Sequence, residues 1–420
     1  MSLALSLYRW VMVGLSPFSA PLFYRRVRKG KEDVGKFYQR LARDLPPRPV
    51  GELIWMHGAS LGESRLLLNL SRALLQRRPK VRFLFTSQTK SSADMIAANL
   101  PEGALHQMLP FDTPSAAQRF VTHWRPDLCL FAESEIWPNL IEAAARAGVP
   151  LGLLNARMRP KSLQTWRRFA KAGRAVFGQF SLILAADQTT ATGLSALTGR
   201  KIEYVGDLKA AFVPQRHTET AYEKSSLGIF KEADFVLLAA STHPGEEAFV
   251  IEAFRQLDGE ARLIIAPRHI DRADGICAEL ERADLSYTRF SSGGPSEASP
   301  RVLIADTYGQ MNRFYALADC VYLGGAHCPG IGGHNPLEPI GFLKPTLTGP
   351  YTDNFTDLYA ELGDLKGLAI VRDQTELIAQ LNALCPVDAA GLETFIAKRR
   401  GQMEQCLDQV IGLLEQEGDL

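Results

Sequence analysis

The chain has 420 residues, which is long for a single hydrophobic core, so we expect two domains. Lys and Arg number 47 against 46 Asp and Glu, and the resulting net charge of +1 provides no overall field that would favour nucleic acid or another polyanion. The 6 cysteines include no CxxC pair, which argues against a disulfide framework and a zinc site and favours a reducing, cytosolic setting.

The first thirty residues join an apolar run to a basic cluster. Residues 3–23 are mostly apolar, but Arg9, Pro17 and Pro21 interrupt them, so they match a clean spanning helix poorly. A secretory signal would carry its charges before the apolar region, whereas here the cluster at residues 25–31 follows it. This order predicts that residues 1–30 anchor the chain to the cytoplasmic side of a membrane, by spanning it or by lying in its interface. The alternative is an amphipathic helix packed on the protein's own surface.

From residue 52 onward, short apolar strands alternate with amphipathic helical segments. The first strand is expected at 53–57, and a helix at 63–76 follows it with leucines on its core face. Regular βαβ alternation predicts parallel sheets with helices on both faces, and the pattern restarts after Gly206. The remaining strands are expected at 81–86, 105–109, 128–132, 151–155, 181–185 and 203–205, and then at 235–240, 262–266, 301–305, 320–323 and 346–347.

The chain is therefore expected to form two Rossmann-like domains that face each other across a cleft. The first would span residues 31–208 and the second residues 209–392, with a hinge near 207–215. Residues 393–420 have helical periodicity and are expected to pack back on the first domain.

The loops after the strands carry the candidate chemistry, because ligands of open α/β sheets bind beyond the carboxyl ends of the strands. After the first strand, Ser60 and Glu63 have the spacing of a capping box. A carboxylate at this position could equally act as a general base toward a substrate hydroxyl. The residues alone leave both interpretations open.

An acidic pair follows the strand at 128–132. Glu133 and Glu135 lie two residues apart, and on extended chain their side chains would point the same way. Either they form a functional pair, or one of them pairs with Arg157 or Arg159. Lys209 lies at the expected domain junction, where it could stabilise developing negative charge.

The second series of strands offers phosphate-binding features. Arg268 follows Pro267 between a strand and a helix, a place suited to bidentate phosphate contact, although a surface arginine would look the same. In the segment 306–311, Gly309 and the N–H groups after it could meet a nucleotide base or phosphate.

A glycine-rich loop at 324–334 leads into a helix expected to begin Asn335-Pro336-Leu337-Glu338, with Asn335 as its N-cap. Such a loop lets the backbone approach a phosphate closely, although it could also be a tight turn in which Glu338 completes a capping box. Five histidines occur in these loops without any HExxH motif, so we expect no metal site: His57, His243, His269, His327 and His334.

Six segments, in order and approximate spacing over roughly residues 50–350, resemble the 3-deoxy-D-manno-octulosonic acid (Kdo) transferases of lipopolysaccharide synthesis. They are HGASLGE (57–63), ESEIWPN (133–139), NARM (155–158), PRH (267–269), DTYGQM (306–311) and GGHNPLEP (332–339). The resemblance implies a GT-B architecture and no divalent metal or other cofactor. It also implies transfer of Kdo from CMP-Kdo to the lipid A precursor lipid IV-A, with inversion, at the cytoplasmic face of the inner membrane.

Carried over position by position, the resemblance makes Glu63 the general base and Glu133 and Lys209 the stabilisers of the transition state. It makes the following residues CMP-binding: Pro267, Arg268, Gly309, Gln310, Met311, Asn335, Pro336, Leu337 and Glu338. The chain departs from the family at Asp207, where relatives commonly have Asn, at Ala210, where an aromatic residue is frequent, and in the loop 326–331.

The expected partners are CMP-Kdo, the lipid A precursor and anionic membrane headgroups, and nucleic acid is not among them. The alternative function is another GT-B nucleotide-sugar enzyme, either a hexosamine transferase or a UDP-sugar 2-epimerase. A third hypothesis is a catalytically inactive scaffold at the membrane. No motif records how many Kdo residues are added.

Overall fold

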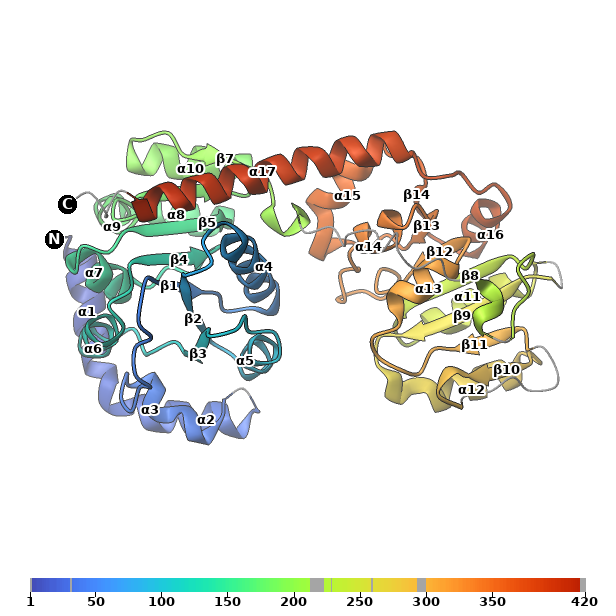
Figure 1. The fold of residues 1–420 in the computed structure, drawn as a ribbon, viewed down its shortest axis with the longest axis horizontal. Helices are drawn as coiled ribbons and strands as arrows, with labels where there is room; N and C mark the ends of the chain where they lie inside the picture. Colours follow the sequence, from blue (N-terminus) through green and yellow to red (C-terminus); the bar gives the residue numbers. More distant parts are fainter. Residues whose placement is uncertain are drawn as a thin grey trace. The chain divides into compact units, whose positions relative to one another are not determined.

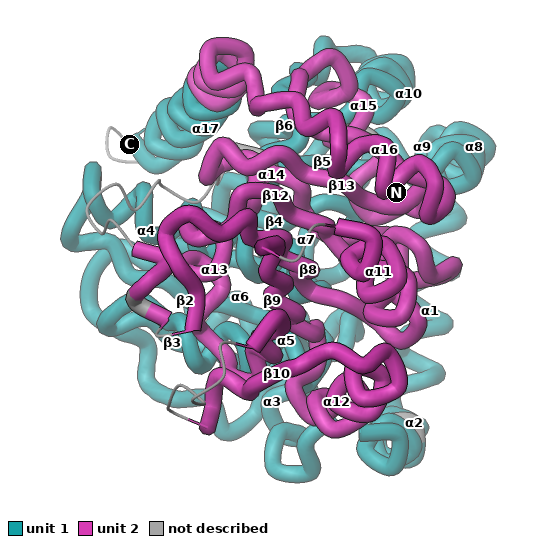
Figure 2. Tube along the Cα trace, turned by 90° about the vertical axis from the view of Figure 1, so that its right-hand side faces the viewer, with its two compact units in different colours: residues 1–212, 398–420 teal, residues 213–397 magenta. Residues whose placement is uncertain are grey.

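The computed structural model describes residues 2–30, 32–211, 223–227, 229–257, 260–292 and 300–415. The chain forms two compact units, coloured separately in Figure 2. Unit 1 comprises Met1–Phe212 and Lys398–Leu420, and unit 2 comprises Val213–Ala397. The boundary expected between residues 208 and 209 thus falls inside unit 1, and Lys209 belongs to unit 1.

Unit 1 is built on a seven-stranded parallel sheet of order β3-β2-β1-β4-β5-β6-β7 (Figure 1). This order is that of a doubly wound Rossmann sheet extended by one edge strand. Strands β1 to β3 are added toward one edge of the sheet and β4 to β7 toward the other. The order therefore reverses between β1 and β4, which pair directly. The strands are β1 (Leu53–His57), β2 (Arg82–Ser87), β3 (Leu105–Met108), β4 (Leu128–Ala132), β5 (Leu151–Ala156), β6 (Leu182–Ala185) and β7 (Glu203–Tyr204).

Helices cover both faces of this sheet because its central strands are apolar on both sides. One face packs on the cluster that includes Trp55, Phe120 and Phe131, and the other packs on α4 and the C-terminal helix α17 (Ala389–Glu415). From Lys398 onward α17 belongs to unit 1. The other helices are α4 (Leu61–Arg77), α5 (Lys90–Ala97), α6 (Pro114–Trp124), α7 (Pro138–Arg146), α8 (Pro160–Arg168), α9 (Ala170–Phe177) and α10 (Gln188–Thr198).

The N-terminal segment is helical and belongs to unit 1. It consists of α1 (Leu3–Leu15), α2 (Ser19–Arg28) and α3 (Phe37–Arg40), with short 3-10 turns between them. Helix α1 packs beside α6 and α9. Among the described residues, no helix combines the length and apolarity needed to cross a bilayer.

Unit 2 repeats the architecture with a parallel sheet of order β10-β11-β9-β8-β12-β13-β14. Its strands are β8 (Val236–Thr242), β9 (Arg262–Pro267), β10 (Tyr287–Arg289), β11 (Val302–Ile304), β12 (Cys320–Leu323), β13 (Thr346–Thr348) and β14 (Leu368–Ile370). Its helices are α11 (Glu246–Phe254), α12 (Ala273–Arg282), α13 (Met311–Leu317), α14 (Leu337–Gly341), α15 (Thr356–Leu362) and α16 (Gln374–Asn382).

Every expected strand is present, and each lies within two residues of its expected bounds at both ends. Strands β10 and β14 were not predicted, because each has three half-buried or exposed residues at a sheet edge and therefore carries little apolar signal. Of the hinge expected near 207–215, residues 212–215 lie outside the described residues. Leu208–Ala211 forms a 3-10 turn, η3, in unit 1.

Candidate functional site

Glu63 lies in the first turn of α4, directly beyond the carboxyl end of β1. Its Oε1 accepts a hydrogen bond from the Ser60 hydroxyl (2.7 Å) and its Oε2 accepts one from the Ala59 N–H (2.7 Å). Ser60 in turn accepts a hydrogen bond from the Glu63 N–H, as an N-cap does. Structural capping and a fixed carboxylate therefore coexist at this residue.

The environment of Glu63 favours its protonated form. The residue is 7% exposed, and burial raises the pKa of its carboxyl group above the ordinary value. The hydrogen bonds from Ser60 and Ala59 oppose this shift, whereas the negative charges of Glu135 and Glu133 add to it. A carboxylate whose pKa is moved toward neutrality is well suited to accept and release a proton.

Glu133 and Lys209 form an ion pair at the same edge of the sheet. Lys209 follows β7 and Glu133 follows β4, so the order β4-β5-β6-β7 brings their loops together. A Cβ built on Gly62 would lie 3.1 Å from Lys209 Nζ, which places the ammonium group beside the start of α4. The structure thus gathers Glu63, Glu133 and Lys209 within unit 1.

Asn155 and Asp207 join this group through hydrogen bonds. Asn155 Nδ2 donates to Asp207 Oδ1 (3.1 Å) and to Glu133 Oε1 (3.4 Å). Asp207 also accepts from the Lys209 N–H (2.9 Å) and pairs with Arg157 (3.3 Å). Asp207, one of the departures from the family pattern, therefore helps to fix the backbone of Lys209.

The prediction that Glu133 and Glu135 point the same way on extended chain is wrong. Glu133 has φ 54°, a left-handed conformation that turns the chain after β4. Glu135 Oε2 instead contacts His57 Nε2 (3.0 Å) and accepts a hydrogen bond from Trp137 Nε1 (2.9 Å). Burial acts to raise the pKa of Glu135, but the His57 and Trp137 contacts outweigh it and the pKa is lowered. The two carboxylates therefore have separate partners.

In unit 2, the expected phosphate-binding residues follow β9 and β11. Arg268 is exposed, and its N–H donates to the Thr242 carbonyl (3.0 Å). No ion pair engages its guanidinium within the described part of the chain. Gly309 has φ 84°, a left-handed conformation in which a residue with a side chain would be strained. A Cβ built on Gly309 would have no atom within 4 Å. Gly309 directly precedes Gln310 and the start of α13 at Met311.

The expected start of the helix after the glycine-rich loop needs a correction. Helix α14 begins at Leu337 and is only 5 residues long, with Pro336 just before it. Asn335 still caps the turn, because its Oδ1 accepts a hydrogen bond from the Leu337 N–H (3.0 Å). Glu338 Oε2 accepts a hydrogen bond from the buried Tyr315 hydroxyl (3.3 Å).

The glycine-rich loop is organised by Glu246, a residue that the sequence analysis did not single out. Glu246 Oε2 accepts from the N–H groups of His243 (2.9 Å) and Gly325 (2.7 Å), and Oε1 accepts from the His327 N–H (3.0 Å). A Cβ on Gly324 would lie 2.7 Å from this carboxylate. The N–H groups of Gly325 and His327 therefore bind the chain's own carboxylate, and later in the loop the Gly333 N–H donates to the Gly325 carbonyl (2.9 Å).

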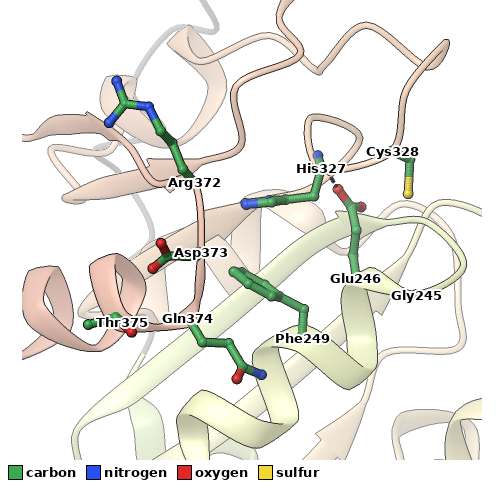
Figure 3. Close-up of a pocket in the computed structure, with 9 residues that line it drawn as sticks. All are labelled: Gly245, Glu246, Phe249, His327, Cys328, Arg372, Asp373, Gln374 and Thr375. Carbon is green, nitrogen blue, oxygen red and sulfur yellow. Dashed lines mark hydrogen bonds between the residues drawn. The ribbon is translucent and has the colours of Figure 1, made fainter.

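A cavity of about 710 Å³ lies beyond the carboxyl ends of β8, β12 and β14 in unit 2 (Figure 3). The rings of Phe249 and His327 lie side by side at its centre, 4.4 Å apart between centroids. None of the expected CMP-binding residues lines it. The loop 326–331, noted as a departure from the family, contributes His327 and Cys328, whereas Arg372 could not be foreseen because β14, which precedes it, was not predicted. The lining residues of the cavity are Gly245, Glu246, Phe249, His327, Cys328, Arg372, Asp373, Gln374 and Thr375.

The structure brings two of the loop histidines into contact, His243 and His334, with 3.0 Å between their Nε2 atoms. Burial lowers the pKa of both rings, to about 4 for His334. Within the described ranges, no group of three or more His, Cys, Asp or Glu side chains is placed to hold a metal ion.

Comparison with known proteins identifies the family. A family model described as 3-deoxy-D-manno-octulosonic-acid transferase (kdotransferase) matches residues 32–212. The 3-deoxy-D-manno-octulosonic acid transferase of Rickettsia bellii is 31% identical over 381 residues, which cover 90% of each chain. That of Haemophilus influenzae is 28% identical over 417 residues, or 96% of this chain and 95% of the relative.

The chain belongs to the Kdo transferase family. A solved structure, UDP-GlcNAc 2-epimerase from Neisseria meningitidis bound to UDP-GlcNAc, aligns with a TM-score of 0.54 at 12% identity and covers 86% of this chain and 99% of that one. This likeness shows the fold alone, the two-domain GT-B architecture. The Kdo transferase is a glycosyltransferase with this architecture, and the family match disfavours the epimerase alternative.

Proposed function

We propose that this transferase moves Kdo from CMP-Kdo to the lipid A precursor lipid IV-A, with inversion and with Glu63 as the general base. The observation that carries the proposal is the Glu63 carboxylate, which is buried, held by Ser60 and Ala59, and raised in pKa. An acceptor hydroxyl bound at this carboxylate gives up its proton as its oxygen attacks the anomeric carbon of the donor.

The bond between the anomeric carbon and the CMP phosphate breaks in the same step, and negative charge develops on the departing phosphate. We assign binding of that phosphate and of the nucleotide to Pro267, Arg268, residues 309–311 and residues 335–338. The exposed Arg268 guanidinium supports this assignment, since its planar fork can make two hydrogen bonds to a phosphate. Donors fixed in advance at the place where charge develops lower the barrier.

In unit 1, we assign the stabilisation of developing negative charge to Lys209. Glu133 holds its ammonium group, and Asp207 holds its backbone N–H beside the start of α4. Such a fixed cation stabilises negative charge in the transition state without reorganising during the reaction. The role of Glu133 is then to orient Lys209.

We place the enzyme at the cytoplasmic face of the inner membrane, with α1 lying in the interface. One face of α1 is fixed to unit 1, where the Tyr8 hydroxyl donates to the buried Asp112 (2.8 Å) and Arg9 pairs with Glu142. The other face is apolar and exposed, with Leu3 88% and Trp10 74% accessible. Six exposed apolar residues recur at helical spacing, namely Leu3, Leu7, Trp10, Val11, Leu15 and Phe18, whereas Val13, which is also exposed, lies off this face.

The basic residues at the end of α2 also support the placement of α1 in the membrane interface. Arg25, Arg28 and Lys29 at the end of α2 are exposed, and basic residues next to an apolar face are attracted to anionic headgroups. Leu7→Gln should therefore reduce flotation with vesicles that contain anionic phospholipid. Val50→Gln, which replaces an apolar residue 93% exposed outside the N-terminal helices, should not. Equal flotation of the two variants would contradict the assignment of α1.

The function is tested by incubating the purified chain with CMP-Kdo and lipid IV-A and reading the products by mass. The wild type should yield lipid heavier by one or more Kdo units, and the increments count the sugars added. Glu63→Gln should bind CMP but transfer almost no Kdo. An intact, CMP-binding wild type that transfers nothing to lipid IV-A would overturn the proposed acceptor and favour the scaffold hypothesis.

A further inference from the structure

The strongest feature outside the assigned site is a concentration of positive charge in unit 1. Between Ala143 and Ala186 the chain contains no aspartate or glutamate, although the whole molecule is almost neutral. The nearest acidic residues on either side have partners, since Glu142 pairs with Arg146 and Asp187 caps α10. The basic residues of this stretch are Arg146, Arg157, Arg159, Lys161, Arg167, Arg168, Lys171 and Arg174.

We call residues 157–174 the basic segment. Its side chains at Arg159, Lys161, Arg167, Arg168, Lys171 and Arg174 are exposed. None of these six forms an ion pair with another described residue. Like charges close together in the sequence repel one another, and no ion pair among the described residues offsets that cost for these six side chains. A solvated helix would ordinarily mix both signs of charge, so the composition indicates an anionic ligand.

The basic segment begins at the candidate active site. It follows directly from the carboxyl end of β5, the strand between β4 and β6. Arg157 Nη2 lies 3.3 Å from Asp207 Oδ2, and Asp207 connects through Asn155 to Glu133, the partner of Lys209. An anion bound at Arg159 and Lys161 would thus lie on the same sheet edge as the proposed base.

The other end of the basic segment lies toward the helix assigned to the membrane interface. Helix α9, which carries Lys171 and Arg174, packs beside α1. Phe169, between α8 and α9, is 49% exposed and adds an apolar contact among the cations. The segment therefore runs from the carboxyl edge of the sheet, at the end of β5, to α9, a helix that packs beside α1.

We propose that the basic segment binds the phosphate groups of the lipid acceptor, with Arg159 and Lys161 making the contacts nearest the reacting hydroxyl. The proposal rests on the proposed function and adds the residues that recognise the acceptor. Arginine and lysine donate charge-assisted hydrogen bonds to phosphate oxygens, and the exposed Phe169 suits an amphiphile better than a free inorganic anion. Arg159 and Lys161 are positioning residues, because they hold the acceptor and take no part in proton transfer.

The test compares Arg159→Gln/Lys161→Gln with Lys80→Gln/Lys366→Gln. The control also removes two positive charges, from exposed lysines that precede β2 and β14. These lysines lie at the amino ends of their strands, whereas the assigned site residues follow carboxyl ends of strands. Each protein is assayed in detergent solution with CMP-Kdo and either lipid IV-A or the same lipid with its phosphates removed. KM and kcat are measured for both acceptors, and melting temperatures verify that each variant folds.

The Arg159/Lys161 variant should raise KM for the phosphorylated acceptor by about ten- to a hundredfold, the range expected for one or two lost charge-assisted hydrogen bonds. Its kcat should stay close to that of the wild type, and its KM for the dephosphorylated acceptor should not change. The control should match the wild type on both lipids. For the wild-type enzyme, the dephosphorylated lipid acceptor should have a higher KM than lipid IV-A.

Two results would overturn the proposal while leaving the transferase function intact. The first is an unchanged KM, or an equal rise of KM on both acceptors, in the Arg159/Lys161 variant. The second is an unchanged KM in detergent combined with weaker flotation on anionic vesicles, which would assign the segment to bulk headgroups. A wild type without transfer activity would refute the proposed function itself.

Discussion

Replacing Glu63 by glutamine should strongly slow transfer while leaving the start of α4 intact. The amide oxygen can still accept from the Ala59 N–H, and the amide N–H₂ can donate to the Ser60 hydroxyl oxygen, so both contacts survive. The variant keeps a side chain of the same shape but loses the negative charge and the ability to take a proton. Loss of a positioned general base costs about 10²–10⁴ in rate, and we expect kcat to fall by that factor.

Glu63→Ala should have the same effect on rate and an additional effect on stability. It removes the acceptor of two hydrogen bonds of 2.7 Å and leaves the Ala59 N–H without its partner. An unsatisfied donor costs about 1–3 kcal/mol. For a unit of this size, each kcal/mol shifts the melting temperature by about 2–4 °C, so unit 1 should melt roughly 2–12 °C lower in this variant.

The pH dependence follows from the raised pKa of Glu63. The base must be ionised, so kcat/KM should fall as the pH drops through a value above the ordinary pKa of a glutamate. The free energy of unfolding depends on pH in the opposite direction. The stabilising contribution of Glu63 is present below its unfolded-state pKa and is lost as the pH rises through the higher folded-state pKa. Glu63→Gln should therefore gain stability relative to the wild type between acidic and neutral pH.

The assay is mass-resolved transfer from CMP-Kdo, combined with calorimetry of each variant at several pH values. Ser60→Ala serves as a further check, since it removes a hydrogen bond that lowers the pKa of Glu63 and should move the acidic limb to higher pH. Wild-type transfer by Glu63→Gln would refute the role of the base. A Gln variant that melts below the Ala variant would refute the account of the hydrogen bonds.

Further predictions concern substitutions at three other positions, Lys209, Gly349 and Gly401. Lys209→Met should lower kcat by about 10²–10³ in the transfer assay, because it removes a fixed cation, whereas Lys209→Arg should retain part of the rate; equal rates in the Met variant and the wild type would contradict the role of Lys209. Gly349→Ala should destabilise unit 2 by at least about 1–3 kcal/mol in urea unfolding, since its Cβ would lie 2.3 Å from the Ala326 carbonyl oxygen. Gly401→Ala, in α17 with nothing within 4 Å of the new Cβ, should instead stabilise by about 0.5–1 kcal/mol, and loss of stability there would show that space alone does not decide the outcome.

The sequence determined the two-domain parallel architecture because that information is local. Short apolar runs such as 53–57, 128–132 and 320–323 are typical of buried parallel strands, and the structure has strands with these bounds. The short edge strands β10 and β14 escaped prediction because half-exposed residues carry no such pattern. The resemblance carried by the loop segments identified the family, which the comparisons confirm.

The tertiary structure decided which loop residues meet. The ion pair of Glu133 with Lys209 depends on the order of β4, β5, β6 and β7, and the divergence of Glu133 from Glu135 depends on a left-handed residue after β4. The engagement of the glycine-rich loop by Glu246 joins residues about eighty positions apart. Periodicity in a sequence reports the faces of single elements, whereas contacts between loops arise only when the sheet order and close packing bring distant strand ends together.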